Sequence, residues 1–185
     1  ATTAATLPEG QGLQGYLFPD TYILPLGSSA EELVELMLET FEERVTSTLR
    51  RAFETNGLNL HEAITLAAVI EREAQLADER PLIAGVFLNR LEAGDSLGAD
   101  PTVQFAVAEN PASVARHGWG KRELTLEDLE NPSPYNTRMW AGLPPGPITN
   151  PGLAAIEAVA FAQETDMYYF VADTIKADGS HKFAV

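Results

Sequence analysis

The sequence contains no cysteine and little positive charge. Without cysteine the chain can form no disulfide bond, thiolate nucleophile or Cys-ligated metal site. Lysine and arginine together number 12, against 27 aspartates and glutamates, which gives a formal net charge of −15. A field of that sign repels phosphate backbones and anionic headgroups. We therefore expect no nucleic-acid partner and no membrane contact through the domain itself.

Several familiar sequence signatures are also missing. No stretch approaches the roughly 20 consecutive apolar residues that a transmembrane helix needs. The chain has no H-E-x-x-H, G-x-S-x-G, Walker or G-x-G-x-x-G motif, and its three histidines, His61, His117 and His181, lack the spacing of metal ligands. We therefore expect neither a metal ion nor a cofactor.

The composition is that of a folded protein. The chain has 185 residues, of which 45% are hydrophobic, enough for one sizeable core. Residues 13–24 are aromatic and β-branched, with Pro19 interrupting, and predict an edge strand or an extended segment. We expect residues 1–27 to be a linker and edge strand, and residues 28–185 to form the main domain.

Hydrophobic periodicity predicts three long helices, from a cap at Ser28 or Ser29 to about residue 55, over 59–75 and over 79–93. Shorter helices are expected over 101–109, over 125–130 and from Pro151 to about 163. The last residues, "MYYFVAD" and "HKFAV" around Asp178-Gly179, predict a β-hairpin. The order predicts an α+β fold, mainly helical, with long Pro/Gly-rich loops and a small antiparallel β element near both termini.

The stretch "AAVIEREAQ" (67–75) places two glutamates at the end of an apolar run. On a helix with about 100° per residue, Glu71 falls inside the apolar stripe, whereas Glu73 falls on its margin and is expected to be solvated. Loss of hydration raises the pKa of a carboxyl group and suits it to general acid catalysis. A buried ion pair is the alternative interpretation of Glu71, with candidate partners Arg72, Arg80 and Arg90.

Two loop segments contain residues typical of polar binding sites. "GADPTVQF" (98–105) carries Asp100, Thr102 and Gln104, although Asp-Pro-Thr is also a common helix opening. Residues 133–152 contain five prolines and three glycines, together with Tyr135, Asn136 and Trp140. A loop this stiff suits the wall of a site, and aromatic rings beside amides suit sugars. Packing of the two rings in the core is the alternative.

Taken together, five segments resemble the endolytic murein transglycosylase (MltG, YceG-like) family. They are "LQGYLFPDTY", "AAVIEREAQLADERPLIAGVFLNRL", "LGADPTVQFA", "SPYNTRMWAGLPPGPITNPG" and "YYFVADTIKADGSHKF". The resemblance implies that 1–27 is the remnant of an upstream module, that 28–185 is a transglycosylase-like catalytic domain and that Glu71 is its acid/base. It also implies that the cleft is lined or supported by Glu73, Asn89, Asp100, Thr102, Gln104, Tyr135, Asn136 and the turn over 143–146. Arg138 and Phe105-Ala106 depart from the family pattern, which bears on subsite preference.

The activity that the resemblance implies is cleavage of peptidoglycan between N-acetylmuramic acid and N-acetylglucosamine, leaving a 1,6-anhydromuramic end and limiting glycan strand length. Peptidoglycan strands are the expected partner, and peptidoglycan synthases are further candidates. The expected location is the extracytoplasmic face of the cell membrane, through a single N-terminal anchor absent from this sequence. Three alternatives remain: a hydrolase that uses Asp100 as second carboxylate, a non-catalytic peptidoglycan-binding domain, and a scaffold for cell-wall synthesis.

Overall fold

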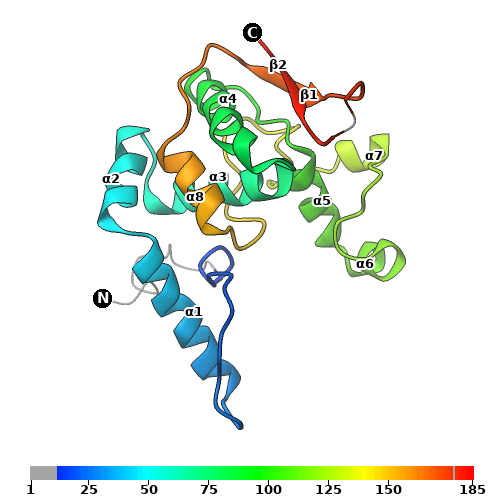
Figure 1. Ribbon diagram of the computed structural model, residues 1–185. Helices are drawn as coiled ribbons and strands as arrows, with labels where there is room; N and C mark the ends of the chain where they lie inside the picture. Colours follow the sequence, from blue (N-terminus) through cyan, green and yellow to red (C-terminus); the bar gives the residue numbers. More distant parts are fainter. Residues whose placement is uncertain (1–11, 177) are drawn as a thin grey trace.

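The computed structural model describes residues 12–176 and 178–185, and it is built mainly of helices with one small hairpin (Figure 1). This confirms the predicted α+β class. None of the helices in the described ranges is both long enough and apolar enough to cross a bilayer. The elements in chain order are α1 (Ala30–Arg44), α2 (Ser47–Thr55), α3 (Leu60–Glu73), the 3₁₀ turn η2 (Ala77–Glu79), α4 (Arg80–Glu92), α5 (Asp100–Ala108), α6 (Pro111–His117), α7 (Leu126–Leu129), α8 (Leu153–Ala160), β1 (Tyr169–Ala172) and β2 (His181–Ala184).

Helix α3 forms the centre of the core. Its residues from Ala63 to Ile70 are all buried, and the helix contacts α2, α4, α5 and α8. Asn59 starts it with a capping box, in which its side chain accepts from the Glu62 amide and Glu62 accepts from the Asn59 amide. Such a cap stabilises a helix by about 1 kcal/mol. The last turn of α3, which carries residues of the site, therefore continues a helix whose position is fixed by its burial in the core.

The helix expected up to residue 55 is divided into α1 and α2. Thr46 adopts an extended conformation, and its side chain accepts a hydrogen bond from the Leu49 amide, which starts a new helix. The apolar spacing survives the break because Phe41, Val45 and Phe53 all remain buried. Periodicity therefore predicted the buried face correctly and missed the cap. Helix α6 was also missed, although Asn110 caps it with Pro111 in its first turn.

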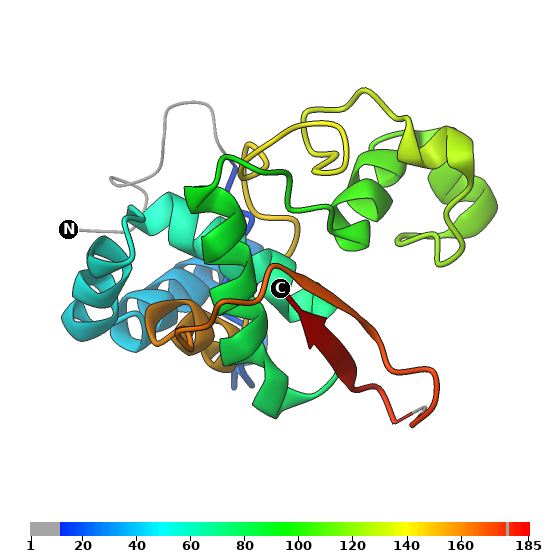
Figure 2. The ribbon, with the colours of Figure 1, turned by 90° about the horizontal axis from the view of Figure 1, so that it is seen from above.

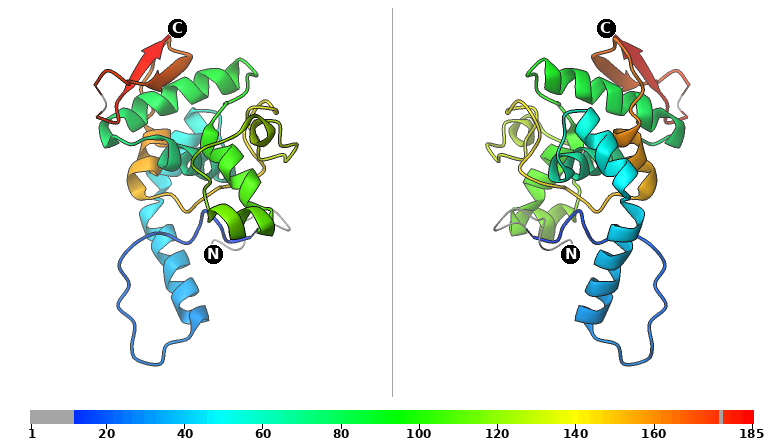
Figure 3. Two further views of the ribbon diagram at one scale, coloured as in Figure 1. Left: turned by 90° about the vertical axis from the view of Figure 1, so that its right-hand side faces the viewer. Right: turned by 90° about the vertical axis from the view of Figure 1, so that its left-hand side faces the viewer.

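The β strand expected near the N-terminus does not form, whereas the extended segment given as its alternative does. Described residues of 13–24 form a turn followed by an extended, unpaired stretch, because Tyr16 and Phe18 insert into the helical core instead of pairing with a strand. The Tyr16 hydroxyl lies 2.8 Å from Nδ1 of His61 on α3. Beyond Phe18 the chain and the first half of α1 project from the body (Figure 3). Residues 1–11, part of the expected linker, lie outside the described residues.

The predicted C-terminal hairpin is confirmed. β1 and β2 pair antiparallel, with Phe170 opposite Phe183 and Ala172 opposite His181. Phe170 contacts Phe87 of α4 edge-on, with ring centroids 5.5 Å apart, and so fixes the hairpin to the helical body. Seen from above, the hairpin and the α5–α7 segment extend from that body as two separate arms (Figure 2). Both arms contribute residues to the site.

Candidate active site

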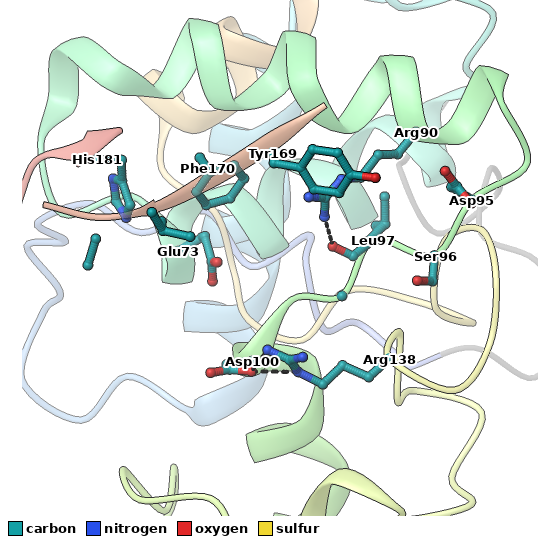
Figure 4. A pocket seen from close by; sticks show the side chains of 13 residues that line it. Glu73, Arg90, Asp95, Ser96, Leu97, Asp100, Arg138, Tyr169, Phe170 and His181 are labelled. Atoms are coloured by element: carbon teal, nitrogen blue, oxygen red, sulfur yellow. Dashed lines mark hydrogen bonds and ion pairs between the residues drawn. The ribbon is translucent and has the colours of Figure 1, made fainter. Parts of the chain in front are cut away.

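A cavity of about 590 Å³ lies where the end of α3 meets α4, the start of α5 and the hairpin (Figure 4). Seven of its thirteen lining residues have ionisable side chains. The lining residues are Glu73, Arg90, Asp95, Ser96, Leu97, Gly98, Asp100, Arg138, Tyr169, Phe170, Val171, Ala172 and His181. Sequence positions more than 100 residues apart are therefore brought to one place by the fold.

Glu73 is the last residue of α3, and its side chain lines this cavity. The helix ends there because Ala74 adopts an extended conformation. Burial raises the pKa of Glu73 to about 7, and the negative charge of Asp100 adds to the rise, while His181, Arg138 and Arg90 oppose it. A carboxyl group with such a pKa holds its proton for a substantial fraction of the time at neutral pH and can both donate and accept it.

Asp100 and Arg138 form an ion pair at one edge of the cavity. Arg138 donates from Nε and Nη2 to the same Asp100 oxygen, at 2.8 and 2.7 Å. Asn136 positions this arginine, because its Oδ1 accepts the Arg138 amide at 3.0 Å while its Nδ2 donates to the carbonyls of Leu129 and Asn131. Arg138 thus supplies a cation to the cavity.

Arg90 brings a second cation from α4. Its Nε donates to the Tyr168 carbonyl at 2.6 Å and its Nη1 to the Leu97 carbonyl, while its guanidinium lies over the Tyr169 ring at 5.3 Å from the centroid. These contacts join α4, the loop before α5 and β1. Burial lowers the pKa of Arg90, yet an arginine remains charged at any physiological pH. The residue therefore ties together three walls of the cavity and offsets its acidic groups.

Glu71 occupies a different environment from Glu73. It is partly buried, and its Oε2 accepts a hydrogen bond from the Gly152 amide at 3.3 Å, at the N-terminus of α8. Glu71 does not line the 590 Å³ cavity, and none of the ion pairs among the described residues involves it. A carboxylate at a helix N-terminus is stabilised by the amide groups there. The contact joins α3 to α8.

The expectation of a solvated Glu73 is wrong. Two residues turn a helix by about 200°, so Glu71 and Glu73 must face nearly opposite sides of α3. The helical wheel assigned Glu73 to water because it lies on the margin of the apolar stripe, towards Glu62. In the structure, the hairpin and the start of α5 cover it instead. Local spacing shows which face is apolar but not which distant segment covers the other one.

Several residues implicated by the resemblance hold backbone segments next to the cavity and do not line it. Asn89 donates to the carbonyls of Thr165 and Met167, both at 2.9 Å, and so holds the segment before β1. Thr102 is fully buried and bonds to the Ala99 carbonyl and to the Thr137 hydroxyl, at 2.7 and 2.8 Å. Both residues, like the buried Asn136, fix backbone segments and do not line the cavity.

Two other implicated elements lie farther away. Tyr135 packs against Phe105, with ring centroids 4.6 Å apart. The turn over 143–146 is fixed to α3, because the Pro145 carbonyl lies 3.1 Å from Nε2 of His61. Neither element lines the 590 Å³ cavity.

Gln104 lines a second, smaller hollow of about 150 Å³ on another side of α5, together with Arg72 and Trp119. The Trp119 side chain is 73% exposed and also borders the neighbouring hollow around Leu13 and Thr149. We refer to the residues around Arg72, Gln104 and Trp119 as the Trp119 groove. The structure therefore separates Gln104 from Asp100, although the two belong to the same short helix.

The sequence did not predict that residues of the hairpin line the cavity. Tyr169, Phe170 and His181 all line the cavity. Alternation along the hairpin could have shown that Phe170, Phe183 and their neighbours face one side, but not which helix they meet. Within residues 12–176 and 178–185, no three His, Cys, Asp or Glu side chains are grouped so that they could hold a metal ion.

Comparison with known proteins places the chain in one family. The profile of the YceG-like family matches residues 2–185. The endolytic murein transglycosylase of Bacillus subtilis (strain 168) is 37% identical over 163 residues, which cover 86% of this chain and 42% of the relative. That of Streptococcus pneumoniae serotype 2 is 33% identical over 161 residues, 87% of this chain and 28% of the relative.

A crystal structure of a putative YceG-like protein from Listeria monocytogenes superposes with a TM-score of 0.80 at 35% identity, covering 93% of this chain and 52% of the other. The chain thus spans about half, or less, of the length of these relatives. The match covers the cavity, both arms and the core on which they rest. On this evidence the chain belongs to the YceG-like family.

Proposed function

We propose that the cavity is the active site of an endolytic lytic transglycosylase that cleaves peptidoglycan between N-acetylmuramic acid and N-acetylglucosamine, with Glu73 as its acid/base. The observation that carries the proposal is a carboxyl group with a pKa near 7 that opens onto a large polar cavity. The names of the relatives in Bacillus subtilis and Streptococcus pneumoniae support the same reaction class.

The reaction needs only one carboxyl group. Protonated Glu73 donates its proton to the glycosidic oxygen, and the bond to the muramic C1 breaks through an oxocarbenium-like state. The muramic C6 hydroxyl then attacks C1 and transfers its proton to ionised Glu73. One C–O bond is broken, one is formed, no water is consumed, and the acid is regenerated. An intramolecular nucleophile is favoured by its high effective concentration, which replaces the second carboxylate of most glycosidases.

A hydrolase remains the nearest alternative because Asp100 shares the cavity with Glu73. A hydrolase of the inverting type would use Asp100 to activate water. In the structure two N–H groups of Arg138 already occupy one Asp100 oxygen. This pairing favours a role for Asp100 in setting the proton affinity of Glu73 over a role as base. A non-catalytic binding domain or scaffold would have no need of a carboxyl group with a raised pKa.

The wider role follows from the reaction. A cut within glycan strands would limit their length, and such a substrate lies on the extracytoplasmic side of the membrane. An N-terminal anchor in a longer form of the protein and cooperation with peptidoglycan synthases belong to the same proposal, and both rest on the resemblance to the family.

The test is digestion of purified sacculi by the full-length protein, followed by mass spectrometry of the products. Wild type is expected to release muropeptides that are lighter by one water than hydrolytic products, and Glu73→Gln is expected to release none. Glu71→Gln is the matched control, two residues away on the same helix. An inactive Glu71→Gln beside an active Glu73→Gln would return the acid/base role to Glu71. Products of full hydrolytic mass would establish the hydrolase instead.

A further inference from the structure

The hairpin residue His181 is fixed by contacts with Glu79 and Phe170. Glu79, at the end of η2, accepts two hydrogen bonds from it: the His181 amide lies 2.9 Å from Oε1 and the ring Nδ1 lies 2.7 Å from Oε2. Both side chains are largely buried, at 10% and 16% exposure. The Phe170 ring meets the imidazole edge-on, with centroids 5.3 Å apart. Two hydrogen bonds and one ring contact therefore fix the orientation of the imidazole.

This orientation determines what the ring offers to the cavity. Because the Glu79 carboxylate can only accept, Nδ1 carries a proton and donates it. In the neutral ring, Nε2 is then left as an acceptor. No hydrogen bond to Nε2 is formed within the described part of the chain, and His181 lines the cavity beside Glu73 (Figure 4). A clamped ring with one unused nitrogen at a cavity wall is the arrangement expected of a group that meets a ligand.

We propose that His181 is a second catalytic residue of this site, whose Nε2 accepts a hydrogen bond from a sugar hydroxyl at the reaction centre, and that Glu79 is the residue that positions it. The inference rests on the proposed transglycosylase function and adds a residue to it. In the reaction described above, the muramic C6 hydroxyl must turn towards C1 and release its proton to Glu73. An acceptor on the hairpin beside Glu73 can hold a hydroxyl of that sugar in the required orientation.

Electrostatics agrees with this placement. A positive charge on His181 lowers the pKa of Glu73, so the two groups are close enough to interact. The charged groups that share the cavity wall are Arg90 from α4, Asp100 from α5, Arg138 from the Pro-rich loop and Asp95 from the loop after α4. None of them forms a hydrogen bond with the His181 ring among the described residues. Glu79 is therefore the group that sets the tautomer of the ring.

Two substitutions at position 181 separate a role at the substrate from a structural role. Asparagine can reproduce the Nδ1 donor to Glu79 but has no atom in the place of Nε2, whereas glutamine reaches the place of Nε2 and gives up the clamp. If Nε2 contacts the sugar, His181→Gln retains a higher kcat on sacculi than His181→Asn. If the clamp alone matters, the order is reversed. Equal values, or a higher value for His181→Asn, overturn the proposal.

Glu79→Gln provides an independent measurement. The amide oxygen can still accept the His181 amide, but its NH₂ group donates to Nδ1 and moves the ring proton to Nε2, which turns the acceptor into a donor. Loss of one hydrogen bond in the transition state corresponds to a fall in kcat of about tenfold. We expect that fall with KM and Tm nearly unchanged. An unchanged kcat at equal Tm would contradict the positioning role.

Lys182→Gln is the matched control. Lys182 lies next to His181 on the same strand, pairs with Asp173 at 3.1 Å, and does not line the cavity, so kcat should not change. All variants are measured in the full-length protein with the mass-spectrometric assay. If wild type itself released no anhydromuramic product, the proposed function would fail. If wild type is active and the position-181 variants rank in the structural order, only this inference fails.

Discussion

The end of α3 separates two hollows that differ in character. On one side, the 590 Å³ cavity contains Glu73 and several other ionisable groups, among them His181 and Arg90. On the other, the Trp119 groove measures about 150 Å³, and Arg72 is the ionisable residue of its lining. Glu73 and Arg72 are neighbours in sequence, yet Glu73 lines the cavity and Arg72 lines the groove, because consecutive residues of a helix point in different directions. The proposed chemistry requires the charged cavity, whereas the groove offers a ring face and an amide, which suit binding.

The largest expected contrast is between the two glutamates of α3. Glu73→Gln should lower kcat by at least about 100-fold, because general acid catalysis contributes on that order or more. Glu71→Gln replaces the partly buried carboxylate that accepts the Gly152 amide with a neutral amide oxygen, and it should act mainly on Tm. Product release from sacculi and thermal unfolding, measured on both variants, check the contrast. Comparable kcat losses in the two variants at equal stability would mean that the two sides of α3 are not functionally distinct.

The second contrast concerns stability and pH. The pKa of Glu73 is raised by folding from the usual 4.5 to about 7, so the folded state binds its proton more tightly than the unfolded state. The resulting stabilisation is complete below about pH 4.5 and is lost as pH rises through 7. Glu73→Gln cannot ionise, so relative to wild type it should gain on the order of 3 kcal/mol in unfolding free energy between pH 4.5 and 8.5.

Denaturant unfolding at those two pH values measures this gain. Because the same two proteins are compared at both pH values, any pH-independent effect of the glutamine on the unfolding free energy cancels. A difference between wild type and variant that is the same at both pH values would show that the carboxyl group is not desolvated in the folded protein.

A smaller effect is expected from Asp100→Asn. The charge of Asp100 raises the pKa of Glu73, and Arg138, which lowers it, is paired with Asp100. Removal of the aspartate charge should therefore lower the pKa of Glu73 and move the alkaline limb of the kcat/KM profile to lower pH. In this profile activity falls as Glu73 loses its proton. A variant that keeps the wild-type limb but produces water-bearing products would indicate instead that Asp100 serves as a base.

The smallest effect is expected in the Trp119 groove. Trp119 is mostly exposed and fills no core position, so Trp119→Ala should leave Tm nearly unchanged. If the groove binds a distal sugar of the strand, the variant should raise KM for long glycans by up to about tenfold, the value of one stacking contact. Its kcat should not change. Trp119→Phe is the control that keeps a ring, and a fall in kcat without a change in KM would place the groove in the chemical step.

Much of the scaffold could be predicted from sequence because its signals are local. The bounds of α3 and α4 follow from apolar spacing, helped in α3 by the Asn59 cap, and the hairpin follows from two aromatic, β-branched runs around a turn. The failures share a different cause. Glu73 was expected in water, and Tyr16 and Phe18 in a strand, because what covers them is far away in the sequence. His181 was not expected to face the cavity for the same reason: its neighbours Glu79 and Glu73 lie about 100 positions earlier.

Gly85, on the buried side of α4, makes the position of the hairpin wall sensitive to a remote substitution. A Cβ atom at this position would lie 2.1 Å from the Gln163 carbonyl oxygen, so the helix and that backbone can touch only while residue 85 has no side chain. The segment runs on from Gln163, through the carbonyls held by Asn89, to Tyr169 and Phe170. Even an alanine at position 85 is expected to push this segment outward and to displace the hairpin wall of the cavity. We therefore expect the substitutions accepted at Gly85 to be limited by the shape of a cavity that this residue does not line.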